Sequence, residues 1–267
     1  MSLFKHSVYV WSFAAALILS RPMLGQSPQL PPSPVVNGAS FRIGGAAPGG
    51  IVSLFGSNLS QVVEAASTTP LPDQLNFTSV WINGGAAPLY FVSPGQINLQ
   101  IPAELGPGAY NIQVGNSIYG SATATITVAR SSPGIFTTNE AGSGQGVVFN
   151  AGYALVDGSA PATAGDTVQV YCTGLGAATP PVATGSLGPA NPPAVVNSAV
   201  TATIGGIPAK VLSAIVAPGY VGLYQVDVTV PAGVPTGNAV AIVLTQTDLS
   251  TNPPNSVSSN SATIAIR

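Results

Sequence analysis

The chain has 267 residues, among which glycine (31) and proline (25) are frequent and charged residues make up only 5%. Glycine and proline favour turns over long helices, and an apolar fraction of 46% supplies a core and argues against disorder. Six basic residues are too few for the clustered lysine and arginine that a nucleic acid or an acidic membrane attracts, so the sequence predicts neither partner.

Residues 1–25 have the features of a secretory signal. Lys5 and His6 precede an apolar run over residues 7–20, and Gly25 provides a small residue at the expected cleavage point. The apolar run is shorter than the roughly 20 residues that span a membrane. We therefore expect a secreted or cell-surface protein without stable membrane insertion after cleavage, with an uncleaved anchor as the alternative.

Cleavage would remove His6, which is the only histidine of the chain. Without an imidazole base, Ser-His-Asp and Cys-His mechanisms lose a required group, and so do histidine-bearing zinc sites. The single cysteine, Cys172, can form no internal disulfide. Because it lies in the alternating stretch "TVQVYCTG", we expect a buried thiol, the alternative being a reactive or intermolecular one.

After a proline-rich linker at 26–34, the sequence repeats itself. The pairs of matching segments keep their order along the chain: "APGGIVSLFGSNL" and "TAGDTVQVYCTGL", "VWINGGAAP" and "ATIGGIPAK", "QINLQIPAELGPG" and "QVDVTVPAGVPTG", "ATITV" and "ATIAI". This order predicts two homologous domains, at 35–130 and 141–267, joined by a connector at 131–140.

Each unit contains about seven short alternating stretches separated by turn signals. In the first unit we expect strands at 35–41, 51–56, 78–82, 88–92, 96–101, 109–114 and 122–128. In the second we expect them at 147–155, 167–172, 200–204, 209–216, 223–230, 239–244 and 262–266. The predicted fold class is all-β, with two tandem immunoglobulin-like β-sandwiches that apolar packing rather than a disulfide holds together.

The alternation in "QINLQIP" and "QVDVTVP" also assigns side chains to faces of the sheet. The apolar positions are expected in the core: Ile97, Leu99, Ile101, Val226, Val228 and Val230. The polar positions are expected to point outward: Gln96, Asn98, Gln100, Gln225, Asp227 and Thr229. Because the outward residues differ between the two copies, we interpret them as the solvated side of a strand rather than as a duplicated binding stripe.

The repeated segments also resemble a known family. The stretches "APGGIVSLFGSNL", "APLYFVSPGQINLQIP", "GDTVQVYCTGLG" and "GLYQVDVTVPAGVPTGNAV" look like the uncharacterised secreted C-terminal domain family named after Solibacter, and the units are similar to IPT/TIG immunoglobulin-like domains. The resemblance covers about residues 35–267. It implies export and a pair of β-sandwiches, but no activity and no functional residues.

Two aromatic residues are candidates for contact with a ligand or partner. Trp81 aligns with Thr203 on the polar side of the matching strand, so we expect its indole to face outward, where it could stack on a sugar or anchor a protein. The alternative is that the other unit or a loop covers it. Tyr220, in "APGYVGLY", is a weaker candidate of the same type.

Two long loops, 60–77 and 177–199, occupy corresponding places in the two units. Loops of this length are usually functional or disordered, although simple capping of each sandwich is an equally good interpretation. Between the units, the short stretch "ARSSPGIF" at 129–136 ends in Ile135 and Phe136. We expect these two apolar residues to dock into the domain junction and to fix the arrangement of the units.

The acidic residues suggest little chemistry. A glycosidase needs two carboxylates across a cleft, but the eight acidic residues are scattered. Asp157, Asp166 and Asp73 are weak candidates for calcium, and no cofactor is predicted. We therefore expect a non-enzymatic interaction module for adhesion or scaffolding, with an extracellular protein or polysaccharide as partner. The alternatives are a carbohydrate-binding accessory to a secreted enzyme and a carboxylate-dependent hydrolase.

Overall fold

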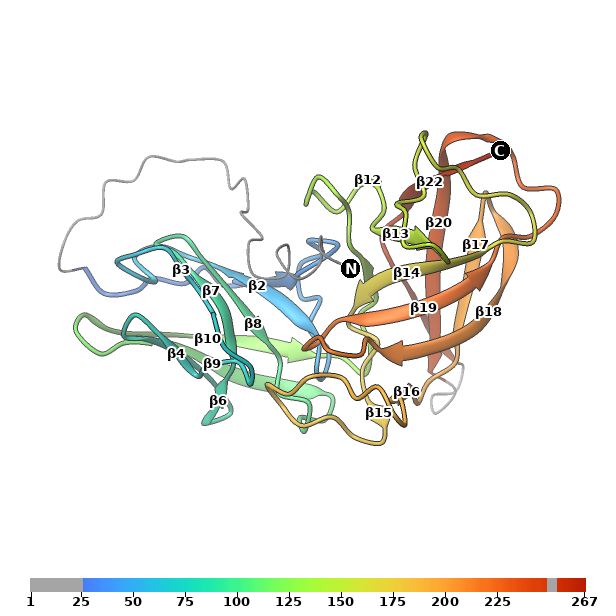
Figure 1. Cartoon of the computed structure of the whole chain (residues 1–267). Helices are drawn as coiled ribbons and strands as arrows, with labels where there is room; N and C mark the ends of the chain where they lie inside the picture. Colours follow the sequence, from blue (N-terminus) through green and yellow to red (C-terminus); the bar gives the residue numbers. More distant parts are fainter. Residues whose placement is uncertain (1–25, 249–253) are drawn as a thin grey trace.

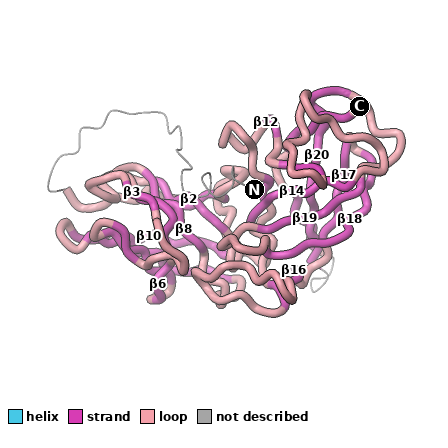
Figure 2. Tube along the Cα trace, viewed as in Figure 1, coloured by secondary structure: helices cyan, strands magenta, loops and turns pink. Residues whose placement is uncertain are grey.

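The computed structural model describes residues 26–248 and 254–267, so the predicted signal at 1–25 lies outside the described residues. Within these ranges the protein consists of strands, turns and loops (Figure 2). No helix that could cross a membrane occurs among them. The strands form two β-sandwiches that lie side by side, the first on the left of Figure 1 and the second on the right.

The first sandwich packs two antiparallel five-stranded layers against each other. One layer has the order β1 (Val35–Asn37), β2 (Ile51–Phe55), β8 (Gln96–Gln100), β7 (Leu89–Val92), β3 (Glu64–Ala65). The other has the order β10 (Gly120–Val128), β9 (Gly108–Asn116), β5 (Thr78–Ile82), β4 (Gln74–Leu75), with β6 (Gly85–Ala87) also paired to β5.

In the second sandwich the long strand β18 belongs to both layers, because it pairs with β19 in one and with β17 in the other. The continuous order is β11 (Gly134–Ile135), β14 (Thr167–Thr173), β19 (Tyr224–Thr229), β18 (Ile207–Val216), β17 (Val200–Ile204), β20 (Gly237–Asp248), β22 (Ala262–Ile266), β12 (Gly144–Gln145). Four short strands attach to it: β13 (Val148–Asn150), β15 (Ala178–Thr179), β16 (Val195–Val196) and β21 (Asn255–Ser258).

Alternating apolar side chains fill the space between the layers of each sandwich, as the sequence predicts. The first core includes Val52, Leu54, Val80, Ile82, Ile97, Leu99, Ile112 and Val114, and the second includes Val168, Val170, Cys172, Val226, Val228, Ile242 and Ile264. The Cys172 thiol is fully buried, and this burial raises its pKa far above the ordinary value. The fold is thus all-β, with two tandem immunoglobulin-like sandwiches, and Cys172 is a small core residue.

A third apolar cluster joins the two sandwiches. It combines Ala39 of the first sandwich with Phe136, Tyr171, Ala217 and Leu223 of the connector and second sandwich. Ile135 lies in the core of the second sandwich and Phe136 in the shared cluster, and both are almost completely buried. The expectation of docking at the junction is confirmed for Phe136, whereas Ile135 belongs to the core of the second sandwich. Apolar packing in the shared cluster restricts relative motion of the sandwiches.

The prediction that the polar side of β8 is solvated is wrong. Gln96, Asn98 and Gln100 are each at most 4% exposed. Asn98 Oδ1 accepts hydrogen bonds of 2.9 Å from Gln96 Nε2 and from the Ser53 hydroxyl. Gln100 Nε2 donates to Gly49 O (3.1 Å), and its Oε1 accepts from the backbone N–H of Gly185 in the second sandwich (2.7 Å).

The matching strand of the second sandwich follows the prediction more closely. Gln225, Asp227 and Thr229 lie on the outer face of β19 and are half-buried. Alternation alone cannot predict that the polar side chains are buried in β8 and half-buried in β19. The burial of Gln100 depends on contact with Gly185, which lies 85 residues further along the chain.

That loop is the predicted 177–199 segment, which fastens the second sandwich to the first. The Thr184 hydroxyl accepts from Ala103 N (2.8 Å) and donates to the Glu104 carboxylate, which also accepts from Thr184 N (3.1 Å). Gly185 O accepts from Leu71 N (3.1 Å), so the two long loops contact each other. At these positions the two long loops therefore form part of the contact between the sandwiches.

The Glu104–Thr184 contact should make the junction sensitive to acid. Burial acts to raise the pKa of Glu104, but hydrogen bonds from Thr184 outweigh it and hold this pKa below its usual value. A carboxyl with a lowered pKa stabilises the fold above its unfolded pKa of about 4.3, and this contribution disappears as the pH falls through the folded pKa.

We expect Glu104→Gln to lower the free energy of unfolding at neutral pH by less than about 1 kcal/mol, since the contact is largely exposed. Urea unfolding should show this difference shrinking below about pH 4. Glu64→Gln, on edge strand β3, is the control. If the loss of unfolding free energy in Glu104→Gln stayed constant from neutral to acidic pH, the stabilising role of the ionised Glu104 carboxylate would be contradicted.

Candidate functional site

Trp81 lies on the outer face of the first sandwich, in the middle of β5. Its neighbours Val80 and Ile82 point into the core, whereas Trp81 is half-buried. The indole packs onto the adjacent strand β9, where a Cβ atom placed on Gly115 would come within 2.6 Å of Trp81 Cζ3. The absence of a side chain at Gly115 therefore allows the ring to lie against the sheet.

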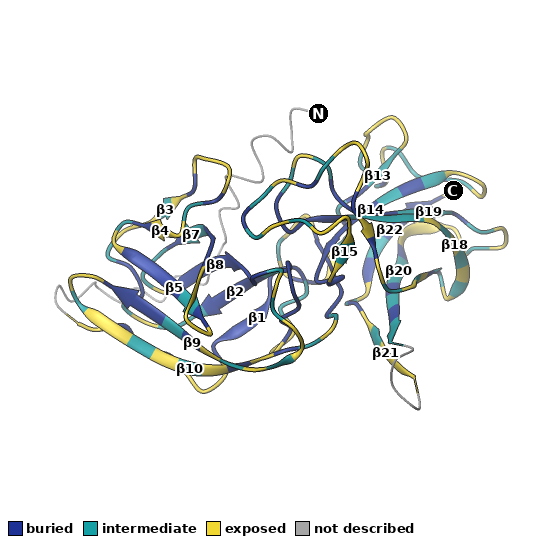
Figure 3. Ribbon diagram, turned by 90° about the horizontal axis from the view of Figure 1, so that it is seen from below, coloured by how far each residue is buried: buried dark blue, intermediate teal, exposed yellow. Residues whose placement is uncertain are grey.

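The face around Trp81 is polar and carries no charge. Across the strands, Trp81 is in register with Gln113, which is in register with Thr123. Gln113 Nε2 donates a hydrogen bond to the Ser121 hydroxyl (3.1 Å). Strands β5, β9 and β10 contain no charged residue, and exposed residues recur along β10 (Figure 3).

The second sandwich has no equivalent of this arrangement. Thr203 occupies the position of Trp81, and the register places Thr245 at the position of Gly115. The first sandwich alone therefore combines an indole with the glycine that accommodates it. We call the outer face of β5, β9 and β10 around Trp81 the tryptophan face; whether it contacts a ligand stays a prediction.

Tyr220 lies elsewhere, in the connection between β18 and β19 of the second sandwich. Its backbone N–H donates to Ala217 O (3.2 Å), and its carbonyl accepts from Gly188 N (2.8 Å). The side chain is half-buried against the cluster that joins the sandwiches, and this burial raises the pKa of its hydroxyl. The structure therefore does not bring the two predicted contact residues, Trp81 and Tyr220, into one site.

A polar network on the outer face of the second sandwich is a feature that sequence reasoning missed. Asp227 Oδ2 accepts from the Ser213 hydroxyl (2.7 Å), and Asp227 Oδ1 accepts from Gln225 Nε2 (2.8 Å). The Tyr171 hydroxyl lies 3.4 Å from Gln225 Oε1. Alternation places Gln225 and Asp227 on this face, but a β-bulge between Val211 and Ser213 sets the direction of Ser213, and that bulge leaves no sequence signal.

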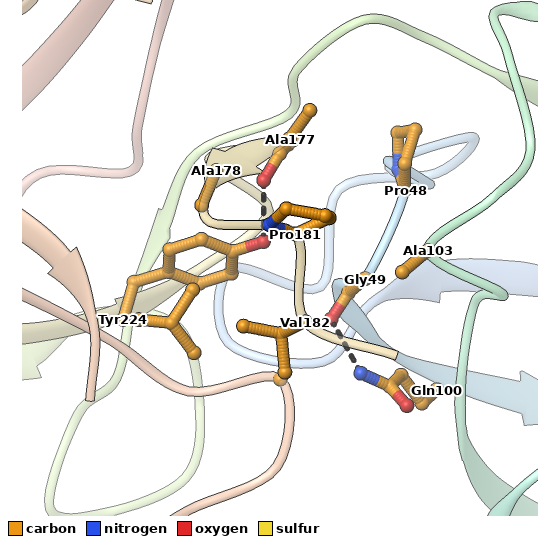
Figure 4. Close-up of a pocket in the computed structure, with 12 residues that line it drawn as sticks. Pro48, Gly49, Gln100, Ala103, Ala177, Ala178, Pro181, Val182 and Tyr224 are labelled. Atoms are coloured by element: carbon orange, nitrogen blue, oxygen red, sulfur yellow. Dashed lines mark hydrogen bonds between the residues drawn. The ribbon is translucent and has the colours of Figure 1, made fainter. Parts of the chain in front are cut away.

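A small pocket lies at the domain junction (Figure 4). Its lining includes Gly49 and Gln100 from the first sandwich and Pro181, Val182 and Tyr224 from the second. The Tyr224 hydroxyl donates to Gly176 O (2.6 Å) at its edge. Its volume is about 60 Å³, and alanine, proline, valine and glycine residues form most of its lining.

Two of the candidate calcium ligands, Asp157 and Asp166, form hydrogen bonds within local turns. Asp157 Oδ1 accepts from the Ser159 hydroxyl (2.6 Å) and backbone N–H (2.8 Å). Asp166 Oδ2 accepts from the Thr163 backbone N–H (2.7 Å) and hydroxyl (2.8 Å). These bonds lower the pKa of both carboxyls. In ranges 26–248 and 254–267, no group of three or more His, Cys, Asp or Glu residues is arranged to hold a metal ion.

The fold and these faces define a tandem immunoglobulin-like β-sandwich protein. No protein-family model matches the sequence, and no curated protein matches it. Among solved structures, SGBP-B of the Bacteroides ovatus mixed-linkage glucan utilization locus, in complex with a mixed-linkage heptasaccharide, is 14% identical with a TM-score of 0.34. The match covers 83% of this chain but only 42% of that one.

Two further similar structures are tandem or multidomain immunoglobulin-like chains. The tandem Ig repeats of Dlar are 10% identical, with a TM-score of 0.22 and coverage of 91% of this chain and 95% of that one. Murine CEACAM1b is 12% identical, with a TM-score of 0.20 and coverage of 83% and 95%. At these values the likenesses carry no argument about function.

The contact between Trp81 and Gly115 can be tested directly. Gly115→Ala should push the indole off the sheet, lower the free energy of unfolding by about 1–3 kcal/mol and shift tryptophan emission to longer wavelength. Trp81 is the sole tryptophan of residues 26–267, so emission of that fragment reports on it alone. Gly85→Ala is the matched control, because a Cβ there would meet nothing closer than 3.6 Å. Unchanged emission in Gly115→Ala would refute the contact.

Proposed function

We propose that the protein is a non-enzymatic, secreted or cell-surface interaction module that binds polysaccharide through the tryptophan face. The observation that carries this proposal is the half-buried Trp81 indole, laid on Gly115 in the middle of an uncharged sheet face. Cleavage of the signal at 1–25 and the resemblance to a secreted domain family are parts of the same proposal.

The chemistry of the tryptophan face suits a neutral sugar chain. The C–H side of a pyranose ring packs against an aromatic surface, and its hydroxyls need nearby hydrogen-bond partners. Gln113 and Ser121 offer an amide and a hydroxyl beside Trp81, and Thr123 extends the polar row across the next strand. Because these side chains project from paired strands, the face changes little on binding, which limits the entropic cost of association.

The alternative of a carboxylate-dependent hydrolase receives less support. Asp157 and Asp166 accept hydrogen bonds within their own turns, and Glu104 is fastened to Thr184. Asp248 forms an ion pair of 2.7 Å with Arg130. These bonds give structural roles to four of the eight acidic residues. An adhesion or scaffolding role towards an extracellular protein would use the same open faces.

The proposal is tested by pull-down of residues 26–267 with insoluble cellulose, xylan, chitin and β-glucan. We expect retention on at least one of them, and a loss of about tenfold or more in affinity for Trp81→Ala, since aromatic anchors dominate such contacts. Thr203→Ala, at the matching position of the second sandwich, should bind as the unaltered protein does.

Circular dichroism and thermal unfolding of both variants confirm that they are folded. Failure of the unaltered protein to bind any of the polysaccharides, or equal binding by Trp81→Ala, would overturn the proposal.

A further inference from the structure

The outer face of the second sandwich carries a second arrangement of polar and aromatic side chains, centred on Asp227. Strands β13, β14, β19 and β18 lie side by side in this layer, and Asp227 is in register with Gln169 on one side and Ser213 on the other. Gln169, Gln225, Asp227 and Ser213 are all half-buried. We call this the aspartate face.

The hydrogen bonds of the aspartate face converge on the Asp227 carboxylate. The Ser213 hydroxyl and one N–H of Gln225 both point to the Asp227 carboxylate, and the Tyr171 hydroxyl points to Gln225. A carboxylate has about four acceptor positions, so Asp227 keeps free capacity. Gln169 Oε1, in the neighbouring position, is buried and accepts no hydrogen bond. A ligand that complements the Asp227 carboxylate must supply N–H or O–H donors.

The charge of Asp227 is not neutralised by an ion pair. In the part of the chain that the structure describes, the salt bridge joins Arg130 to Asp248. Lys210 lies on the same layer, opposite Thr229, but forms no ion pair with Asp227. A donor that also carries positive charge therefore fits this face better than a neutral one.

Two aromatic rings lie on strands of the same layer as Asp227: the Tyr171 hydroxyl on β14 contacts Gln225, and Phe149 on β13 is in register with Gln169. Phe149 and Tyr171 meet edge to face, with ring centroids 5.8 Å apart and an interplanar angle of 80°. Burial, followed by the charges of Tyr220, Tyr153 and Asp227, raises the pKa of Tyr171 to about 12. Aromatic rings next to a carboxylate favour an organic ammonium group over a metal ion.

Tyr153 is presented to solvent by a strained turn. Its φ of 60° is in the left-handed region, which bulky residues rarely adopt, and its side chain is 60% exposed. The Asn150 side chain fixes the turn, because its Oδ1 accepts from Gly152 N (2.9 Å) and Ala154 N (3.0 Å). Strain of this kind is retained where the surroundings hold it in place, commonly at binding sites.

We propose that the aspartate face binds an amino sugar, with the protonated amine hydrogen-bonded to Asp227 and the sugar ring extending over Gln169 towards the half-buried Phe149. This inference rests on the proposed function in taking the ligand to be a glycan. It assigns to the second sandwich a preference for a cationic sugar, distinct from the neutral sugar of the tryptophan face.

The test compares two probes that differ in one group, a glucosamine hexasaccharide and an N-acetylglucosamine hexasaccharide. Calorimetric titration of residues 26–267 carrying Trp81→Ala, which removes the anchor of the tryptophan face, should show binding of the first, weakening with added salt, and binding of the second weaker by about tenfold or more. Asp227→Asn should lose about tenfold in affinity for the amine-bearing probe.

The control Asp157→Asn removes a carboxylate from an exposed turn of the same sandwich and should leave binding unchanged. Because every titration uses the Trp81→Ala background, its outcome does not depend on the test of the tryptophan face. Equal affinity for the two probes, no binding of the glucosamine probe, or full binding by Asp227→Asn would each overturn the inference.

Discussion

The arrangement of the two sandwiches depends on the Gln100 side-chain amide. The Gln100 amide donates a hydrogen bond to Gly49 O in the first sandwich and accepts one from Gly185 N in the second. One buried side chain therefore forms hydrogen bonds with both sandwiches at the junction. Glycines make this approach possible: a Cβ on Gly222 would come within 2.8 Å of Gly49 O. Without the Gly185 N–H, the Gln100 oxygen would be a buried acceptor without a partner, which costs about 1–3 kcal/mol.

The two matching strands, β8 in the first sandwich and β19 in the second, have different roles. In the first sandwich the polar side of β8 is buried and holds the junction through Gln100. In the second, the same side stays on an outer face and carries the network around Asp227. The two sandwiches therefore present different open surfaces, the tryptophan face on the first and the aspartate face on the second. Because apolar packing and hydrogen bonds join them, these surfaces keep a fixed relation to each other.

Local patterns in the sequence predict the features that depend on local physics. Period-two alternation identifies the core positions Val226 and Val228, and the apolar setting of Cys172 predicts its burial. Alignment of the repeats places Trp81 on the polar side of its strand. The pattern fails at Gln96, Asn98 and Gln100, because their burial depends on tertiary contacts. It also gives no sign of the Trp81–Gly115 pair or of the bulge that orients Ser213.

Binding of a neutral polysaccharide at the tryptophan face is the central claim of this account. The most direct measurement is an NMR titration of ¹⁵N-labelled residues 26–267 with a soluble polysaccharide, following the Trp81 indole N–H and the backbone amides. The account predicts shifts concentrated at Trp81 and along β5, β9 and β10, with the amides of β20 in the second sandwich unmoved. Shifts confined to other surfaces, or no shift of the Trp81 indole at saturation, would contradict it.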